Sequence, residues 1–314
     1  MNKLLVAALI TGAMAVPSFA ADYSIMAPAA PGGGWDQTAR TMQEALQTEG
    51  ISGNVQVTNV PGAGGTIGLA QFVNQSNANP NALIVGGYVM VGAILTNASP
   101  VTLEQVTPIA RLTGEAVALV VPASSDIQTV DDLKAKLVEN VGAVSWAGGS
   151  AGGADHITAG LITKAVGADP TQVNYIAYSG GGEALAAVLG GQVTVGISGY
   201  SEFASQIEAG ELRLLAVSTA ERVPGVDAPT LQEAGVDVAV QNWRMVAAAP
   251  GITEEQKAAI SSDIEKMVDS ATWQAALESR GWVNTYLAGA DFDAQLAEDT
   301  AATESILRDI GLVQ

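Results

Sequence analysis

The sequence predicts an α/β protein folded into two lobes. Short β-like runs alternate with longer helix-like runs along most of the chain, which is typical of parallel strands covered by helices. Glycine-rich turns join several of these strands to the helix that follows. Proline-containing turns at 121–126 and 221–229 each follow a strong β run, and we expect them to mark paired crossings between the lobes.

The first half of the chain shows this alternation in order. Apolar residues at helical spacing from Trp35 to Leu46 predict a helix after the first strand, and a similar run around Phe72 predicts one after the second. A further helix over 129–140 begins at the candidate N-cap Thr129 and carries acidic residues in its first turn. The strands predicted before residue 150 cover 23–28, 55–60, 82–87, 116–122 and 141–148.

The second half continues the pattern and then becomes mostly helical from Thr253 onward. Its other predicted elements are a helix over 155–167, a strand–turn–helix–strand unit over 173–200, a strand over 212–219, and amphipathic helices over 260–268 and 292–307. We expect one lobe to comprise 21–122 with 222–314, and the other to comprise 123–221.

The first twenty residues predict a secretory signal peptide, 1–20. Lys3 precedes an apolar run over 4–16, and a small-residue cleavage site ends at Ala20. The apolar run is too short and too rich in glycine and alanine to span a bilayer comfortably. We therefore expect an exported, periplasmic protein.

Composition narrows the range of partners. The chain has 32 Asp and Glu against 13 Lys and Arg, a formal net charge of −19, so nucleic acid is excluded as an expected partner. It has no Cys and one His, which argues against disulfides and transition-metal sites. We expect no cofactor, no metal and a monomer.

Three glycine-rich turns share one design: 31–36, 61–68 and 178–185 each follow a strand and open a helix. A helix N-terminus carries unpaired N–H groups and the positive end of the dipole, and glycine lets an anion approach them. In the structural alternative, each glycine merely lets a strand turn into a helix. Because the design recurs, we favour a small-anion site made without Arg or Lys. A nucleotide site is disfavoured, since Ile67 holds the place of the third fingerprint glycine.

Several side chains near these turns have two interpretations. Asp36 is expected to accept backbone N–H bonds at its helix start, and Arg40 to pair with it one turn later. Trp35 either lines a pocket or belongs to the core. Tyr88, Tyr178 and Tyr200 lie near predicted strand ends, where each could reach a ligand or pack at a rim.

An enzymatic alternative comes from "GGSAG" at 148–152, which matches the nucleophile-elbow pattern of serine hydrolases. The single His, His156, follows Ser150 by only six residues on the next helix, whereas α/β hydrolases place the acid and then the His much later. We therefore expect no catalysis. A secreted carboxylester hydrolase using Ser150 remains the alternative function.

Six motifs occur in one order along the chain: "APAAPGGGWDQTAR", "NVPGAGGTIG", "TPIARLTGEAVALVVPASSDIQTVDDL", "ADHITAGLITKAVGAD", "NYIAYSGGGEALAAVLGGQV" and "LLAVSTAERVPGVDAPTLQEAG". In these motifs the chain resembles the tripartite tricarboxylate transporter substrate-binding proteins, also called Bug receptors, over nearly all of 22–314. The resemblance implies a two-lobed periplasmic-binding-protein fold with a ligand cleft between the lobes.

The resemblance also implies which residues meet the ligand. Backbone amides and ordered waters at the first two glycine-rich turns would hold a carboxylate, and turns of the second lobe would add contacts. Many members have Thr or Pro at the position of Trp35, so a ring here would narrow the cleft or stack on the ligand. The expected ligand-binding residues are Pro31, Gly32, Gly33, Gly34, Trp35, Asp36, Gly62, Ala63, Gly64, Gly65, Thr66, Ser150, Ala151, Gly152, Ser179, Gly180, Gly181 and Tyr200.

The expected function is that of a solute receptor without enzymatic activity. It would capture a small organic di- or tricarboxylate of the C4–C6 type and deliver it to the membrane permease subunits of a tripartite tricarboxylate transporter. The scarcity of basic residues near the motifs favours dicarboxylates slightly over tricarboxylates. A sensor that reports occupancy to a signalling partner is a third possibility.

Overall fold

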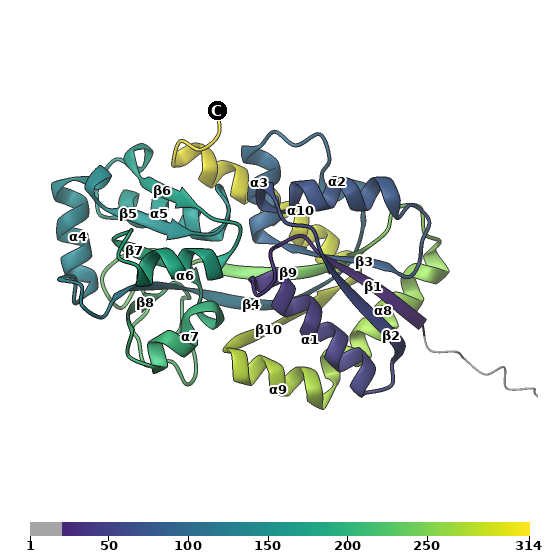
Figure 1. Ribbon diagram of the computed structural model, residues 1–314. Coiled ribbons are helices and arrows are strands. Elements are labelled where there is room, and N and C mark those ends of the chain that lie inside the picture. Colours follow the sequence, from purple (N-terminus) through teal and green to yellow (C-terminus); the bar gives the residue numbers. More distant parts are fainter. Residues whose placement is uncertain (1–20) are drawn as a thin grey trace, which may run out of the picture.

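The computed structural model describes residues 21–314, so the expected signal peptide lies outside the described residues. Its strands form one continuous hydrogen-bonded arrangement with the order β2-β1-β3-β9-β4-β7-β5-β6, and β8 and β10 also pair with β4. Figure 1 shows these strands gathered in two lobes with helices around each. The α/β class and the arrangement in two lobes are confirmed.

The strands are β1 (Ala21–Ala27), β2 (Ser52–Asn59), β3 (Ala82–Gly87), β4 (Thr107–Pro122), β5 (Ser145–Gly148), β6 (Asn174–Ala177), β7 (Val195–Gly199), β8 (Leu212–Val217), β9 (Gln241–Ala248) and β10 (Trp282–Ala288). The α-helices are α1 (Gly34–Thr48), α2 (Thr66–Gln75), α3 (Tyr88–Thr96), α4 (Val130–Glu139), α5 (Ala154–Ala165), α6 (Gly181–Leu189), α7 (Tyr200–Glu208), α8 (Glu254–Asp269), α9 (Ala271–Arg280) and α10 (Gly289–Asp309).

Strand β4 belongs to both lobes. Up to Ala116 it pairs antiparallel with β9 and β10, and from Val117 onward it pairs antiparallel with β7 and β8. In Figure 1 it runs from one lobe into the other beside β9. We call the lobe of β1, β2, β3, β9 and β10 the first lobe, and that of β5–β8 the second. The expected division of the chain at residues 122 and 222 remains a proposal.

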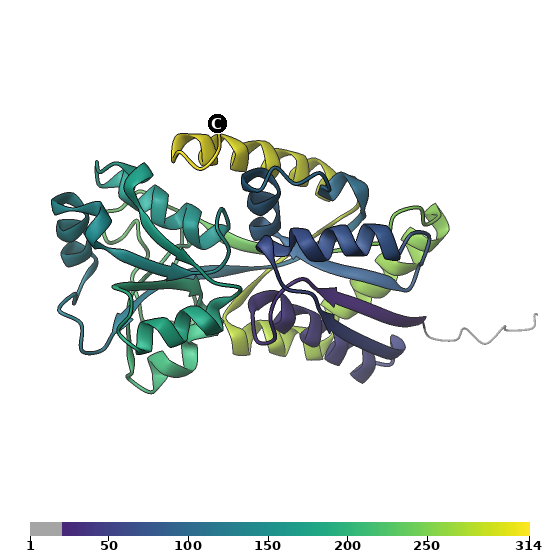
Figure 2. The same cartoon turned by 45° about the horizontal axis from the view of Figure 1, so that its top comes forward.

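Helices cover both faces of the first lobe's sheet. In Figure 2, α1, α8 and α9 lie on one side of it, and α2, α3 and α10 lie on the other. The apolar faces of these helices supply fully buried side chains such as Met42, Leu46 and Phe72. No helix within 21–314 is long and apolar enough to cross a membrane.

Among the strands and α-helices, the sequence prediction missed α3, α7, β9 and β10, and also the first half of β4, 107–115. Helix α3 reads "YVMVGAILT", which is apolar on nearly all sides, so its sequence lacks the helical period. Strand β9 carries Arg244 inside an apolar run, and β10 is the only strand between the C-terminal helices in the described chain. The sheet is also mixed, not wholly parallel, because the strands that pair with β4 all run antiparallel to it.

The connections explain where a site can form. Strands β1, β2 and β3 pair side by side in the first lobe, with β1 parallel to both neighbours, and β5 is parallel to β6 and β7 in the second. The carboxyl ends of parallel strands meet at one edge of a sheet, which is where ligands of open α/β sheets bind. The glycine-rich turns of the two lobes therefore face each other.

Candidate functional site

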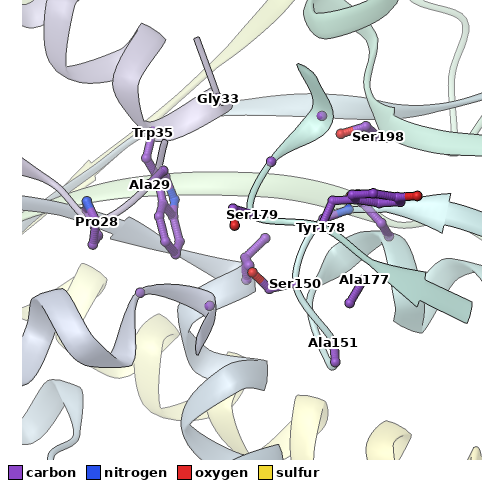
Figure 3. A pocket seen from close by; sticks show the side chains of 18 of the residues that line it. Pro28, Ala29, Gly33, Trp35, Ser150, Ala151, Ala177, Tyr178, Ser179 and Ser198 are labelled. Carbon is purple, nitrogen blue, oxygen red and sulfur yellow. The ribbon is translucent and has the colours of Figure 1, made fainter. Parts of the chain in front are cut away.

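A cavity of about 380 Å³ lies between the lobes, within the range of small-molecule sites. Figure 3 shows Pro28 and Trp35 on the side of the first lobe, with Ser150, Ser179 and Tyr178 across from them. The first lobe contributes Pro28, Ala29, Gly33, Gly34, Trp35, Gly62, Ala63, Gly64, Gly65, Val89, Asn97, Asn242 and Arg244. The second contributes Gly149, Ser150, Ala151, Asp155, Ala177, Tyr178, Ser179, Gly180, Gly181, Glu183, Ser198 and Glu202.

The first turn is closed by the side chain of Asp36. Its Oδ2 accepts the N–H of Gly32 at 2.8 Å, and its Oδ1 accepts from Nδ2 of Asn59 at 2.9 Å. Arg40 pairs with the same carboxylate at 2.9 Å, as predicted. Burial alone would raise the pKa of Asp36, but the hydrogen bonds from Arg40, Gly32 and Asn59 outweigh it and lower the pKa. Asp36 thus shapes the turn from behind and does not line the cavity.

The second turn uses glycine for close packing as well as for its backbone angles. Gly64 and Gly65 have φ values of 62° and 88°, which disfavour other residues. A Cβ on Gly65 would lie 2.6 Å from the ring of Trp35, and one on Gly64 would lie 2.3 Å from Cβ of Ala93. Trp35 is therefore both a core residue and a cavity-lining residue, because it is 7% exposed and also lines the cavity.

The turns of the two lobes approach each other closely at the cavity rim. A Cβ on Gly180 would lie 3.6 Å from Cα of Gly33, and one on Gly64 would lie 3.3 Å from Cβ of Ser150. Such short separations leave the glycine-rich turns almost in contact across the cleft. A ligand in the cavity would therefore be enclosed by both lobes.

In the second lobe, the chain's own carboxylates hold the amides of the turns. Gly181 N–H donates to Oε1 of Glu202 at 3.2 Å, and Ser179 N–H donates to Oε2 of Glu183 at 3.0 Å. Gly149 N–H donates to Oδ2 of Asp155 at 2.8 Å. The N-caps of α1, α2, α5 and α6 all lack a side-chain hydrogen bond in the described chain, so the difference lies in the N–H of Gly181, the first residue of α6, which Glu202 accepts. The ligand contacts expected at Ser179–Gly181 and 150–152 remain proposals.

Two of these carboxyl groups, those of Asp155 and Glu202, lie in surroundings that disfavour their charged form and raise their pKa. Burial, followed by the nearby charges of Glu202 and Glu115, raises the pKa of Asp155 to about 7 despite the hydrogen bond from Gly149. Burial and Glu115 also raise the pKa of Glu202, whose Oε2 accepts a 2.6 Å hydrogen bond from Ser198 Oγ. The second lobe therefore lines the cavity with carboxyl groups whose pKa values are raised.

A buried ion pair lies at the floor of the cavity. Arg244 is 1% exposed, Glu115 is fully buried, and Nη2 of Arg244 donates to Oε2 of Glu115. Glu115 Oε1 also accepts the N–H of Ser201 at 2.8 Å, at the start of α7. The guanidinium stacks on Trp282, 5.1 Å from the ring centre, and its Nη1 has no hydrogen-bond partner within 21–314.

Twelve of the expected site residues line the cavity: Gly33, Gly34, Trp35, Gly62, Ala63, Gly64, Gly65, Ser150, Ala151, Ser179, Gly180 and Gly181. Pro31, Gly32, Asp36, Thr66 and Gly152 lie in the same turns or at their helix starts but do not line it. Tyr200 lines a separate hollow with Glu208 and Arg280. Tyr178 lines the cavity, whereas Tyr88 is buried against Trp243.

Sequence reasoning missed the charged part of the site. The expectation of a site without Arg or Lys is wrong for the cavity lining, because Arg244 lines it. The available signal was a lone arginine in the apolar run "NWRMVAAA". Asp155 and Glu202 each lie in a helical first turn, where an acid is commonly explained by the helix dipole, so their sequence positions carried no site signal.

His156 is arranged differently from a catalytic base. Its Nδ1 accepts the N–H of Gly152 at 3.3 Å, and its ring stacks on Tyr175 with the centres 4.1 Å apart. Burial lowers the pKa of His156 to about 4, so the ring is neutral near pH 7. These contacts assign His156 a structural role in the turn that carries Ser150.

Comparisons with known proteins agree with this geometry. A family model described as a tripartite tricarboxylate transporter family receptor matches residues 38–312. Protein BugT of Bordetella pertussis is 28% identical over 284 residues, which cover 87% of this chain and 86% of BugT.

Two solved structures share the fold. The periplasmic binding protein BugD superposes with a TM-score of 0.84 at 20% identity, covering 95% of this chain and 99% of BugD. MatC of Rhodopseudomonas palustris, solved with bound malate, has a TM-score of 0.78 at 22% identity and covers 93% and 100% of the two chains. With a family model matched over most of its length and the same two-lobed fold, this chain belongs to the tripartite tricarboxylate transporter receptor family and is a solute-binding protein of that type.

Proposed function

We propose that this receptor captures a small organic di- or tricarboxylate of the C4–C6 type in the cleft between its lobes. The observation that carries this proposal is the pair of helices α1 and α2, whose N-termini open onto a cavity of about 380 Å³ without side-chain caps in the described chain. Their unpaired N–H groups and dipoles favour an anion. The bound malate of MatC supports a carboxylate as the ligand class.

We further propose that the protein acts in the periplasm as a monomer and delivers its ligand to the membrane permease of a tripartite tricarboxylate transporter. Enclosure of the cavity by both lobes supports a receptor that releases its ligand only when the lobes separate. The family and fold are those of substrate-binding proteins, so the receptor is preferred over a hydrolase that uses Ser150.

The test is a thermal-shift screen of residues 21–314 against mono-, di- and tricarboxylates, sugars and amino acids. Ligand at a hundred times its dissociation constant should add about 2.7 kcal/mol to the free energy of unfolding, which raises the melting temperature by roughly 4–8 °C. A shift confined to C4–C6 carboxylates supports the proposal. If sugars or amino acids shift the melting temperature and carboxylates do not, the proposed ligand class is wrong.

A further inference from the structure

We propose that Arg244 binds a carboxylate of the ligand directly and makes the receptor select for the charge of that group. This inference rests on the proposed function and names the residue that recognises the anion. It differs from binding by backbone amides and water alone, because a buried guanidinium would donate a charge-assisted hydrogen bond to the ligand.

The position of Arg244 is built by β9. Asn242 and Arg244 are two residues apart on this strand, so their side chains lie on one face of the sheet, and both line the cavity. Trp243 between them faces the other way, packing near Tyr88 and under Arg111. Strand β9 lies between β3 and β4 and so brings these two polar side chains to the cavity between the lobes.

The bonding of Arg244 is incomplete in a way that points to a ligand. Nη2 donates to Glu115 and the guanidinium face covers the ring of Trp282, yet Nη1 has no partner anywhere in the described chain. Buried polar groups are nearly always hydrogen-bonded, and an unsatisfied charged donor is especially costly. Because Nη1 has almost no accessible surface, the guanidinium must turn toward the cavity that Arg244 lines before a ligand carboxylate can satisfy this donor.

The guanidinium of Arg244 also lies against the first residue of α1. A Cβ on Gly34 would lie 2.4 Å from Nη2 of Arg244, so the guanidinium occupies the space that any other first residue of α1 would fill. Arg244 and the uncapped start of α1 therefore place two sources of positive potential side by side. Glu115 neutralises only one edge of the guanidinium.

The test uses wild type and the double variant Glu115→Gln, Arg244→Gln, which removes both charges together and leaves no buried ion unpaired. Calorimetry compares the tightest of succinate, malate and citrate with the monoamide of the same acid, in which one carboxylate is neutral. Wild type should prefer the acid by roughly thirtyfold or more, and the double variant by less than about threefold. A general loss of structure would weaken both ligands equally and leave the ratio unchanged.

Two further variants keep the test decisive. Arg244→Lys keeps a charge beside Glu115 but lacks Nη1, and it should bind the acid at least about tenfold more weakly than wild type. Arg111→Gln is the matched control, because Arg111 also stacks on a tryptophan, 5.4 Å from the Trp243 ring centre, yet does not line the cavity. Its affinity should stay within about threefold of wild type.

The outcomes separate this inference from the proposed function. If wild type binds a carboxylate and the double variant keeps the same preference for acid over monoamide, Arg244 is not the recognition residue, and the receptor function stands. If wild type binds none of the three acids, both proposals fall together.

Discussion

The two lobes present opposite chemistry to the same cavity, although both do so through glycine-rich turns that open a helix. In the first lobe, α1 and α2 begin without side-chain caps in the described chain, and Arg244 adds a positive charge beside α1. In the second, α5 and α6 also lack side-chain caps, but Glu202 accepts the N–H of Gly181 at the start of α6 and Glu183 accepts that of Ser179. Turns of similar sequence therefore differ in whether their N–H groups are free to bind an anion. The difference depends on which side chains from other elements accept those N–H groups.

The difference teaches that a glycine-rich turn is an anion site only when its N–H groups are left available. Asp155 takes the N–H of Gly149 just as Asp36 takes that of Gly32, so each lobe also uses a helical aspartate to shape a turn. Asp36 has Arg40 and Asn59 as partners, which lower its pKa, whereas Asp155 lies near Glu202 and Glu115 and has a raised pKa. We therefore expect the first lobe to provide the main contacts to the anion. The carboxyl groups of the second lobe should modulate the affinity of the protein for that anion.

The largest expected effect comes from adding one methyl group to each lobe at matched positions. Gly34→Ala would place Cβ 2.4 Å from Nη2 of Arg244, and Gly181→Ala would place Cβ 2.6 Å from Cδ of Glu202. Both glycines are the first residue of their helix. Gly34→Ala should cost about 2 kcal/mol of carboxylate binding, or roughly thirtyfold, because it displaces the guanidinium. Gly181→Ala should change affinity by less than about threefold.

Calorimetry on both variants gives the answer, with Gly182→Ala as the control because a Cβ there meets nothing within 4 Å. Equal losses in Gly34→Ala and Gly181→Ala would mean that both lobes grip the anion and would break the comparison.

A smaller effect should appear as a pH dependence of binding. Asp155, with a pKa raised to about 7, is protonated below that value and gains a negative charge above it. Carboxylate affinity should therefore fall by roughly fivefold, about 1 kcal/mol, as pH rises from about 5.5 to about 8.5. Asp155→Asn keeps an oxygen for Gly149 N–H and should flatten this dependence. A wild-type affinity that rises with pH would refute the assignment.

The same group links pH to the stability of the ligand-free protein. Its folded pKa lies above the unfolded value of 3.8, so the folded state binds more protons between pH 3.8 and about 7. Stability from this group is fully present below about pH 3.8 and is lost as pH rises from there to about 7. Thermal melts of wild type and Asp155→Asn should therefore diverge across that window and differ by a constant amount above it, with the variant the more stable.

The smallest effect is expected at the shaping aspartate of the first lobe. The Arg40 side chain is 51% exposed, so its ion pair with Asp36 is largely screened by solvent. Arg40→Gln should lower the free energy of unfolding by about 0.3–0.5 kcal/mol, because Gly32 and Asn59 still hold the carboxylate. Carboxylate affinity should stay within about twofold. A large loss of binding would instead mean that Arg40 contacts the ligand. Melting curves measure the change in stability and calorimetry measures the change in affinity, so together they distinguish a structural role from a binding role.

Much of the fold was accessible from local pattern. Strands such as 82–87 and helices such as 129–140 have the apolar periods and caps that local interactions determine, and the structure confirms them with a capping box at Thr129. Helix α3 was missed because an element that is buried on most sides loses its period. The glycine signal located two real walls of the cavity, but it could not distinguish anion binding from packing against Trp35 and Ala93.

By itself, the sequence determined the order of most strands and helices, the glycine-rich turns at strand ends and the strongly acidic composition, because these depend on neighbours along the chain. Only the tertiary structure decided the chemistry of the cleft. Arg244 reaches Gly34 because β9 inserts between β3 and β4, and Glu202 reaches Gly181 because α7 packs beside α6. Contacts between such distant residues follow from the order of strands in the sheet, which the local pattern of residues does not encode.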